Sequence, residues 1–204
     1  MVIAIDLGNI YSGVAWAFDN NEPKFVTGWE TRSGTPSTEV NVPSALYYGG
    51  SNNYDNPEWG FKVPHDPEVL TWRAIQASHR CRQGSPHLAK VKQIMRKLGK
   101  KSFEIVGDYL RKLWSHSWDY ICQSEGLEHQ SAFNVVLCIL SPVTWPSDTR
   151  VEITNALRHA GVLHDITRER FPLRFLTDFS TAVFAWCRRC RLILCYLAYP
   201  VHGD

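Results

Sequence analysis

The 204-residue chain lacks any apolar run long enough to cross a bilayer. A transmembrane helix needs roughly 20 consecutive apolar residues, and the longest run here, Leu192–Val201, is about half that length and contains a proline. The first residues also lack the basic leader of a signal peptide, and they reach an acid at Asp6. These absences predict a cytoplasmic protein.

The chain also lacks an excess of either charge, because 22 basic residues face 20 acidic ones and the net charge is only +2. Nucleic-acid-binding proteins normally carry a concentrated basic surface, so we expect no nucleic-acid partner. Six cysteines in a chain without a secretory leader predict reduced thiols. Cys138, inside an apolar stretch, is expected to be a small core residue.

One stretch near the start organises the rest of the chain. Val2–Leu7 is apolar except for Asp6 and predicts a buried strand, and Ser12–Phe18 predicts a second one. Glycine in the turn between them lets backbone amides approach a bound anion. Asp6, at the carboxyl end of its strand, suits a hydrated Mg²⁺. The alternative interpretation is a β-hairpin with an acidic turn and no ligand.

The pattern Asp-Leu-Gly-x-x-Tyr-Ser-Gly-Val-Ala, residues 6–15, resembles the first phosphate-binding hairpin of the actin / sugar kinase / heat-shock chaperone superfamily. The similarity is greatest to the divergent, fungal-type heat-shock-chaperone-like proteins. It implies Mg²⁺ at Asp6, and it implies that ATP or ADP phosphates are held by the turn residues Gly8, Asn9, Ile10 and Tyr11. Those proteins carry a pair of hydroxyl residues where this chain has Asn9-Ile10, so we expect hydrolysis to suffer more than phosphate binding.

Two later segments resemble the same family. Phe133–Leu140 is an almost continuous apolar strand, and Ser141–Asp148 is similar to the family's "valine-proline-alanine-x-tryptophan" segment, which leads into a helix. We expect that helix to start at Ser147 or Asp148 and to end at Gly161. Phe171–Trp186 resembles a strand and a connecting segment whose acid lies near the metal and the hydrolytic water. The resemblance therefore implies that Asp178 is catalytic together with Asp6.

The remaining elements are expected to be scaffold. Apolar periodicity predicts helices at about 88–98 and 103–124. Strands are expected at Lys24–Trp29, at Val42–Tyr48 with Pro43 at an edge, and at Glu58–Phe61. The family places a lysine near the γ-phosphate where this chain has Pro64. The nearest lysine, Lys62, is either a displaced catalytic group or, the interpretation that we favour, a solvated side chain.

The resemblance implies an α/β fold: a ribonuclease-H-like (actin-like ATPase) mixed sheet with helices, plus a helical and small-strand insertion. The N-terminal lobe would span residues 1–186, with a core sheet from 1–33 and 130–186 and an insertion at about 34–129. Residues 187–204 do not resemble the family. They include Cys187-x-x-Cys190, for which a zinc or redox site is the less favoured alternative.

The family continues with an aspartate-glycine phosphate turn and a second lobe, neither of which follows here, so we expect a truncated form. Phosphoryl transfer needs enclosure from both sides, which predicts weak or vestigial binding of ATP/ADP and Mg²⁺ with little or no hydrolysis. A non-catalytic interaction module is the alternative, binding protein clients or co-chaperones through the helical insertion. A third possibility is a non-functional product that aggregates through an exposed apolar face.

Overall fold

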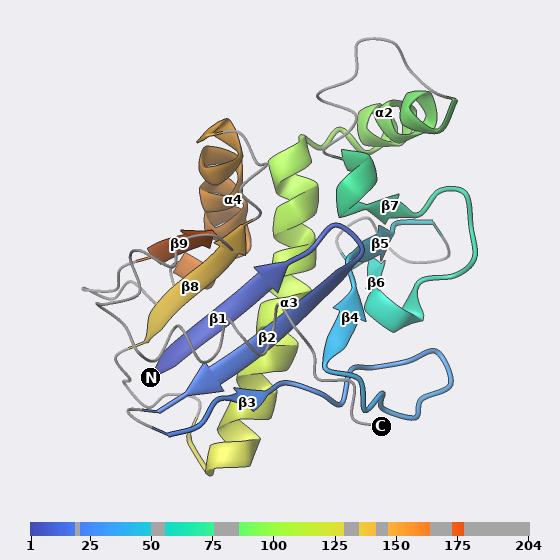
Figure 1. The fold of residues 1–204 in the computed structure, drawn as a ribbon. Coiled ribbons are helices and arrows are strands. Elements are labelled where there is room, and N and C mark those ends of the chain that lie inside the picture. The colour runs from blue at the N-terminus through green and yellow to red at the C-terminus, as the bar shows by residue number, and fades with distance from the viewer. Residues whose placement is uncertain are drawn as a thin grey trace.

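A computed structural model describes residues 1–18, 21–49, 56–75, 86–128, 135–141, 147–163 and 173–177. It shows a mixed α/β fold with a large mixed sheet, a small three-stranded sheet and long helices (Figure 1). Among these residues no helix is both long and apolar enough to cross a membrane.

The large sheet has six strands in the order β3-β2-β1-β8-β9, with β4 also paired to β2. Its strands are β1 Val2–Leu7, β2 Tyr11–Ala17, β3 Lys24–Phe25, β4 Asn41–Pro43, β8 Val136–Ser141 and β9 Leu173–Thr177. The first three are consecutive antiparallel neighbours, whereas β1, β8 and β9 run parallel. Strand β3 is shorter than the strand expected at Lys24–Trp29.

Strand β1 is mostly buried on both faces, as the apolar residues from Val2 to Ile5 predict. Its larger side chains, Ile3, Ile5 and Leu7, belong to the main hydrophobic core. Val2 and Ala4 point to the other face, where they pack in a second cluster of mostly small side chains. This second cluster includes Cys138, which is fully buried, so its predicted role in the core is confirmed.

Three long helices accompany the sheets: α2 Pro86–Leu98, α3 Ser102–Glu125 and α4 Ser147–His159. Helix α3 runs behind β1 and β2 and packs against α4 (Figure 1). All three were expected within a few residues of these bounds. Gly99 and Gly161 follow α2 and α4 with left-handed φ angles of 64° and 81°, a conformation that glycine adopts without a steric penalty.

The small sheet has the order β6-β5-β7 and comprises β5 Ala45–Tyr47, β6 Glu58–Trp59 and β7 Leu70–Thr71, with a 3₁₀ turn, η1, at Gly60–Lys62. The single strand expected at 42–48 is thus two strands, β4 and β5, in different sheets. They separate at Ser44, whose N–H donates to the Ile10 carbonyl and whose carbonyl accepts from the Trp72 N–H. Ser44 thus bonds to the large sheet through its N–H group and to the small sheet through its carbonyl group.

The expected division into a core sheet and an insertion at about 34–129 stays a prediction. Helix α3 belongs to that expected insertion, yet it packs closely on α4. The main hydrophobic core likewise joins residues of both sheets, such as Ile5 and Leu46, to residues of α2 and α3.

Candidate functional site

The candidate site lies where the parallel strands of the large sheet end. Asp6 on β1 is paired with Leu140 on β8, and Leu140 is paired with Leu176 on β9. The carboxyl ends of the three parallel strands are therefore level with one another. Loops at such an edge are where open α/β sheets bind ligands, and the β1–β2 turn is one of them.

The β1–β2 turn is tight, and it depends on Gly8. A Cβ atom at Gly8 would lie 2.1 Å from the carbonyl oxygen of Tyr11, a distance that no side chain tolerates. The ladder of the hairpin closes at Leu7 and Ser12, and the residues between them reach solvent. Ile10 and Tyr11 are 60% and 54% exposed, which is unusual for large apolar side chains.

The amides of this turn are available to a ligand. Among the described residues, the N–H groups of Gly8, Asn9 and Ile10 donate no hydrogen bond. Successive amides in a glycine-containing turn form concavities that bind anions. Phosphate binding by this turn stays a prediction.

Asp6 is the one carboxylate on β1, and its side chain is partly buried. By the alternation of the strand it lies on the face of Val2 and Ala4, opposite the face that packs on the helices. No group of three or more His, Cys, Asp or Glu side chains converges on a metal position within the described part of the chain. A Mg²⁺ ion at Asp6 would therefore take its other ligands from water and phosphate, which Mg²⁺ readily does.

The turn is held in place by contacts that the sequence analysis did not indicate. The Ser44 N–H donates to the Ile10 carbonyl at 2.8 Å, and the buried hydroxyls of Ser12 and Ser44 share a hydrogen bond of 2.7 Å. Pro43 on β4 pairs with Tyr11. These contacts fix the turn against the start of the small sheet, and no local pattern indicates them because they join residues about 30 positions apart.

The other predicted site residues are not brought to this edge by the described structure. Lys62 is partly exposed and forms an ion pair with Glu30. The hydrogen bond from Lys62 lowers the pKa of that carboxyl. This pairing fits a surface lysine. Asp178 lies outside the described residues, one position beyond the end of β9 at Thr177, and Cys187 and Cys190 also lie outside them.

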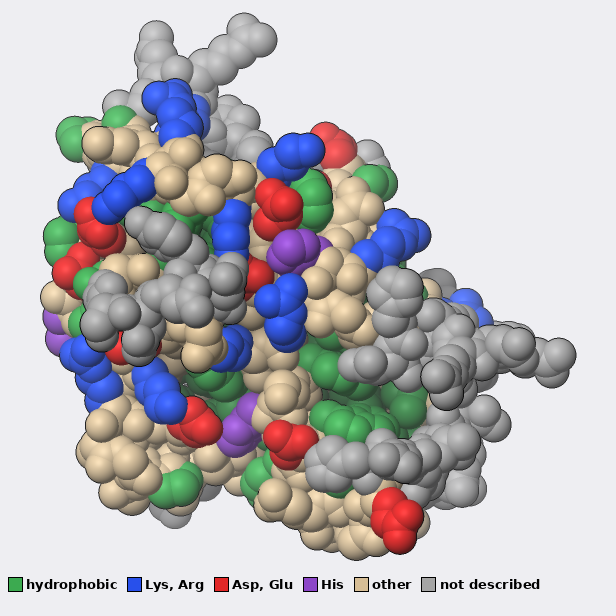
Figure 2. Space-filling view, turned by 180° about the vertical axis from the view of Figure 1, so that it is seen from behind, with side chains coloured by type: hydrophobic (Ala, Val, Ile, Leu, Met, Phe, Trp, Pro, Cys, Tyr) green, Lys and Arg blue, Asp and Glu red, His purple; other side chains and the backbone are tan. Residues whose placement is uncertain are grey.

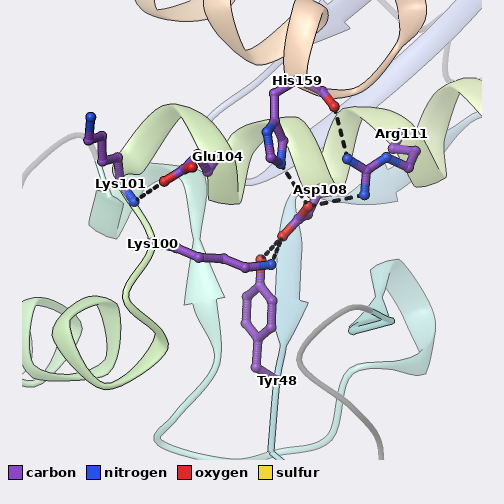
Figure 3. Close-up of polar contacts among 7 residues, drawn as sticks. All are labelled: Tyr48, Lys100, Lys101, Glu104, Asp108, Arg111 and His159. Carbon is purple, nitrogen blue, oxygen red and sulfur yellow. Dashed lines mark hydrogen bonds and ion pairs between the residues drawn. The ribbon is translucent and has the colours of Figure 1, made fainter.

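A second polar cluster surrounds Asp108, a buried residue of α3 that is 3% exposed (Figure 3). Its carboxylate accepts hydrogen bonds from the Tyr48 hydroxyl at 2.6 Å and from Lys100 Nζ at 2.5 Å. On its other oxygen, Arg111 lies 3.2 Å away and His159 Nε2 lies 3.3 Å away. Sequence analysis missed this cluster because its members come from four separate segments.

The Asp108 cluster is a structural ion-pair cluster, because the charge of the carboxylate is balanced by its hydrogen-bond and ion-pair partners. Burial by itself would raise the pKa of Asp108, but the hydrogen bonds from Lys100 and Tyr48 outweigh it and hold that pKa below its usual range. Burial and the bond to Asp108 raise the pKa of Tyr48. Every group in the cluster has a partner, so the cluster ties α3 to α4 and to the small sheet.

Comparison with known proteins adds no relative: no protein-family model matches this chain, and no curated protein does.

Proposed function

We propose that this chain is the N-terminal nucleotide-binding lobe of a heat-shock-chaperone-like ATPase of the actin-like superfamily. In this proposal the β1–β2 turn binds the phosphates of ATP or ADP, and Asp6 holds the accompanying Mg²⁺. The observation that carries it is the turn beside Asp6 at the carboxyl edge of the sheet, in which the N–H groups of Gly8, Asn9 and Ile10 donate no hydrogen bond to another described residue. The proposal places the protein in the cytoplasm, where nucleotide is plentiful.

The topology of the large sheet supports a ribonuclease-H-like fold. The first three strands of the chain are antiparallel neighbours, with β2 on one side of β1. On the opposite side of β1 lie β8 and then β9, and both run parallel to β1. A helix follows β8 and leads to β9. In the order β3-β2-β1-β8-β9, only β2 runs against the direction of the other four strands, and this mixed arrangement supports the proposal.

The register also supports a role for Asp178. Leu176 is level with Asp6 across two strand pairings, and Asp178 follows Leu176 by two positions in the sequence. The carboxyl end of β9 thus lies at the same edge of the sheet as Asp6. In the proposal Asp178 orders a water at the phosphate.

Hydrolysis is proposed to be weak. Asn9 and Ile10 offer the phosphates an amide and backbone donors but no hydroxyl group. Phosphoryl transfer depends on positioning and electrostatic stabilisation of the transferred group, and loss of single contacts of this kind commonly costs orders of magnitude in rate. Binding, which rests on backbone amides and one carboxylate, is less sensitive to these replacements.

Isothermal titration calorimetry with Mg-ATP tests the proposal. We expect binding by the natural chain, and we expect Asp6→Asn and Gly8→Ala to weaken it about tenfold or more, an effect of about 1.4 kcal/mol. Glu22→Gln is the matched control, because Glu22 is exposed and follows β2, at the end of the hairpin opposite to Asp6. This control should bind as the natural chain does.

The outcome that contradicts the proposal is the absence of heat at millimolar Mg-ATP while circular dichroism shows a folded chain. That result would favour the interaction module over the nucleotide site. Equal weakening by Asp6→Asn and Glu22→Gln would also contradict it, since the binding would then follow overall charge rather than the turn.

A further inference from the structure

The positive charge of this chain is concentrated in one segment. Between Glu68 and Glu104 there is no acidic residue, whereas nine lysines and arginines occur there: Arg73, Arg80, Arg82, Lys90, Lys92, Arg96, Lys97, Lys100 and Lys101. A chain with a net charge of only +2 thus contains a long stretch of one sign. Helix α2 forms the middle of this stretch.

Helix α2 buries its apolar face and presents its cations to solvent. Leu88, Val91 and Ile94 are buried, and Val91 and Ile94 belong to the main core. Arg96 and Lys97 are exposed. Figure 2, which views the molecule from behind, shows Lys and Arg side chains gathered in the upper left corner, where α2 lies.

The cations of α2 flank a neutral strip. At about 100° per residue, Lys92 and Arg96 fall on one side of the solvent-facing surface and Lys90 and Lys97 on the other. The exposed residues between the two sides are Ala89 and Gln93, which are small or neutral. We call these six residues the α2 basic face.

Nothing in the described structure neutralises this face. None of Lys90, Lys92, Arg96 and Lys97 forms an ion pair with another described residue. The neighbouring Lys100 differs, because it forms an ion pair with Asp108. Four cations on the solvent-facing surface of one helix, without an ion pair to any described residue, create a local positive potential that attracts an anionic partner.

We propose that the α2 basic face binds an acidic polypeptide segment in an extended conformation. Alternate side chains of an extended segment recur about every 6.6 Å, and the four residues from Lys92 to Arg96 advance about 6 Å along the helix axis. Carboxylates at alternate positions therefore match the cations along one flank. The strip of Ala89 and Gln93 leaves room for the backbone of the partner.

The same face is poorly suited to other anionic partners. Single-stranded nucleic acid is held by stacking on exposed aromatic side chains, and α2 contains no Phe, Tyr or Trp. An interfacial membrane helix must insert its apolar face, and Leu88, Val91 and Ile94 are already buried in the core. An acidic peptide needs only the charges that are present. This inference does not rest on nucleotide binding.

Fluorescence anisotropy with a labelled peptide that alternates Glu and Ser tests the proposal on the full chain. At low salt we expect binding that Arg96→Gln/Lys97→Gln weakens about tenfold. The matched control is Arg32→Gln/Arg158→Gln, which removes the same charge from two exposed arginines outside α2 and should change the affinity by less than about twofold. Binding should fade above about 0.1 M salt, where the screening length falls below about 10 Å.

Three results would overturn the proposal. The first is no binding of the acidic peptide at low salt by a chain that circular dichroism shows to be folded. The second is equal weakening by the α2 variant and its control, which would indicate general charge attraction. The third is tighter, equally α2-dependent binding of a thymidine oligonucleotide or of phosphatidylserine vesicles, which would assign the face to nucleic acid or to a membrane.

Discussion

Two buried tyrosines show how differently the same hydroxyl group is used in this protein. Tyr48 and Tyr109 are each 5% exposed, and burial raises the pKa of both. The Tyr48 hydroxyl donates to Asp108, whereas the Tyr109 hydroxyl lies near Ser12 and Ser44 without the geometry of a hydrogen bond. Those two serines bond to each other instead.

Replacing each tyrosine by phenylalanine should therefore have unequal effects on the free energy of unfolding. Tyr48→Phe removes a hydrogen bond to a charged group and should cost about 1.5–3 kcal/mol. Tyr109→Phe removes a buried hydroxyl without a hydrogen bond and should leave stability unchanged or raise it by about 1 kcal/mol. Urea unfolding at neutral pH measures both, and a larger loss for Tyr109→Phe would show that this reading of the contacts is wrong.

Asp108 predicts a dependence of stability on pH. Its pKa in the folded chain lies below the ordinary value, so the stabilisation is present above the unfolded-state pKa of about 3.9 and is lost as pH falls through the folded-state pKa. Asp108→Asn should cost about 3–5 kcal/mol at pH 7, because it leaves the largely buried Lys100 ammonium without its counter-charge.

The measurement for Asp108 is the free energy of unfolding in urea at pH 7 and at about pH 3. The natural chain should lose more stability over this interval than Asp108→Asn does, since the variant has no carboxylate to protonate at this position. The exposed Glu39 provides the control, and Glu39→Gln should keep the slope of the natural chain. If Asp108→Asn loses as much unfolding free energy over this pH interval as the natural chain does, Asp108 is not the source of the pH dependence.

At the scale of elements, α3 and α4 approach each other closely at Gly107, a contact that the sequence did not indicate. A Cβ atom at Gly107 would lie 2.8 Å from the Ala156 carbonyl oxygen and 2.7 Å from the His159 ring. A glycine in the middle of a helix normally costs about 1 kcal/mol relative to alanine. Here it is kept because it lets the two helices touch.

Gly107→Ala should consequently destabilise the protein by about 1–3 kcal/mol, although alanine is the better helix former. Thermal unfolding followed by circular dichroism measures the loss. Ser117→Ala, on the same helix, is the matched control, because the buried Ser117 hydroxyl has no hydrogen-bond partner among the described residues and its removal should be neutral or stabilising. If Gly107→Ala instead stabilises the protein, the close contact between α3 and α4 does not require glycine at this position.

At the scale of the whole molecule, both sheets share one hydrophobic core. The main core joins Ile3 and Ile5 of the large sheet to Leu46 and Trp59 of the small sheet. The aromatic rings continue the connection, since Trp59 makes edge contacts with Trp29 and with Tyr109 of α3. A shared core of this kind couples the unfolding of its parts.

We therefore expect a single cooperative unfolding transition for both sheets. Native-state hydrogen exchange tests this, because amides of β1 and of β5 should open with the same free energy and the same dependence on denaturant. Amides of β5 that exchange through a separate, lower-energy opening would show that the small sheet unfolds on its own.

Sequence by itself determined the elements whose patterns are local. The apolar run into Asp6, the periodicities of α2 and α3, and the start of α4 at Ser147 were each predicted close to their observed bounds. The need for glycine in the β1–β2 turn was also predictable from the sequence. Each of these features depends on neighbours within a few positions, so the order of residues contains the whole signal.

Only the tertiary structure decided the features that join distant residues. It split residues 42–48 between two sheets at Ser44, gathered Tyr48, Lys100 and His159 around Asp108, and turned the cations of α2 outward. A net charge of +2 averages over the chain and conceals that last arrangement. Buried hydrogen bonds and exposed charges both depend on which surfaces meet, and that is settled only when the elements pack together.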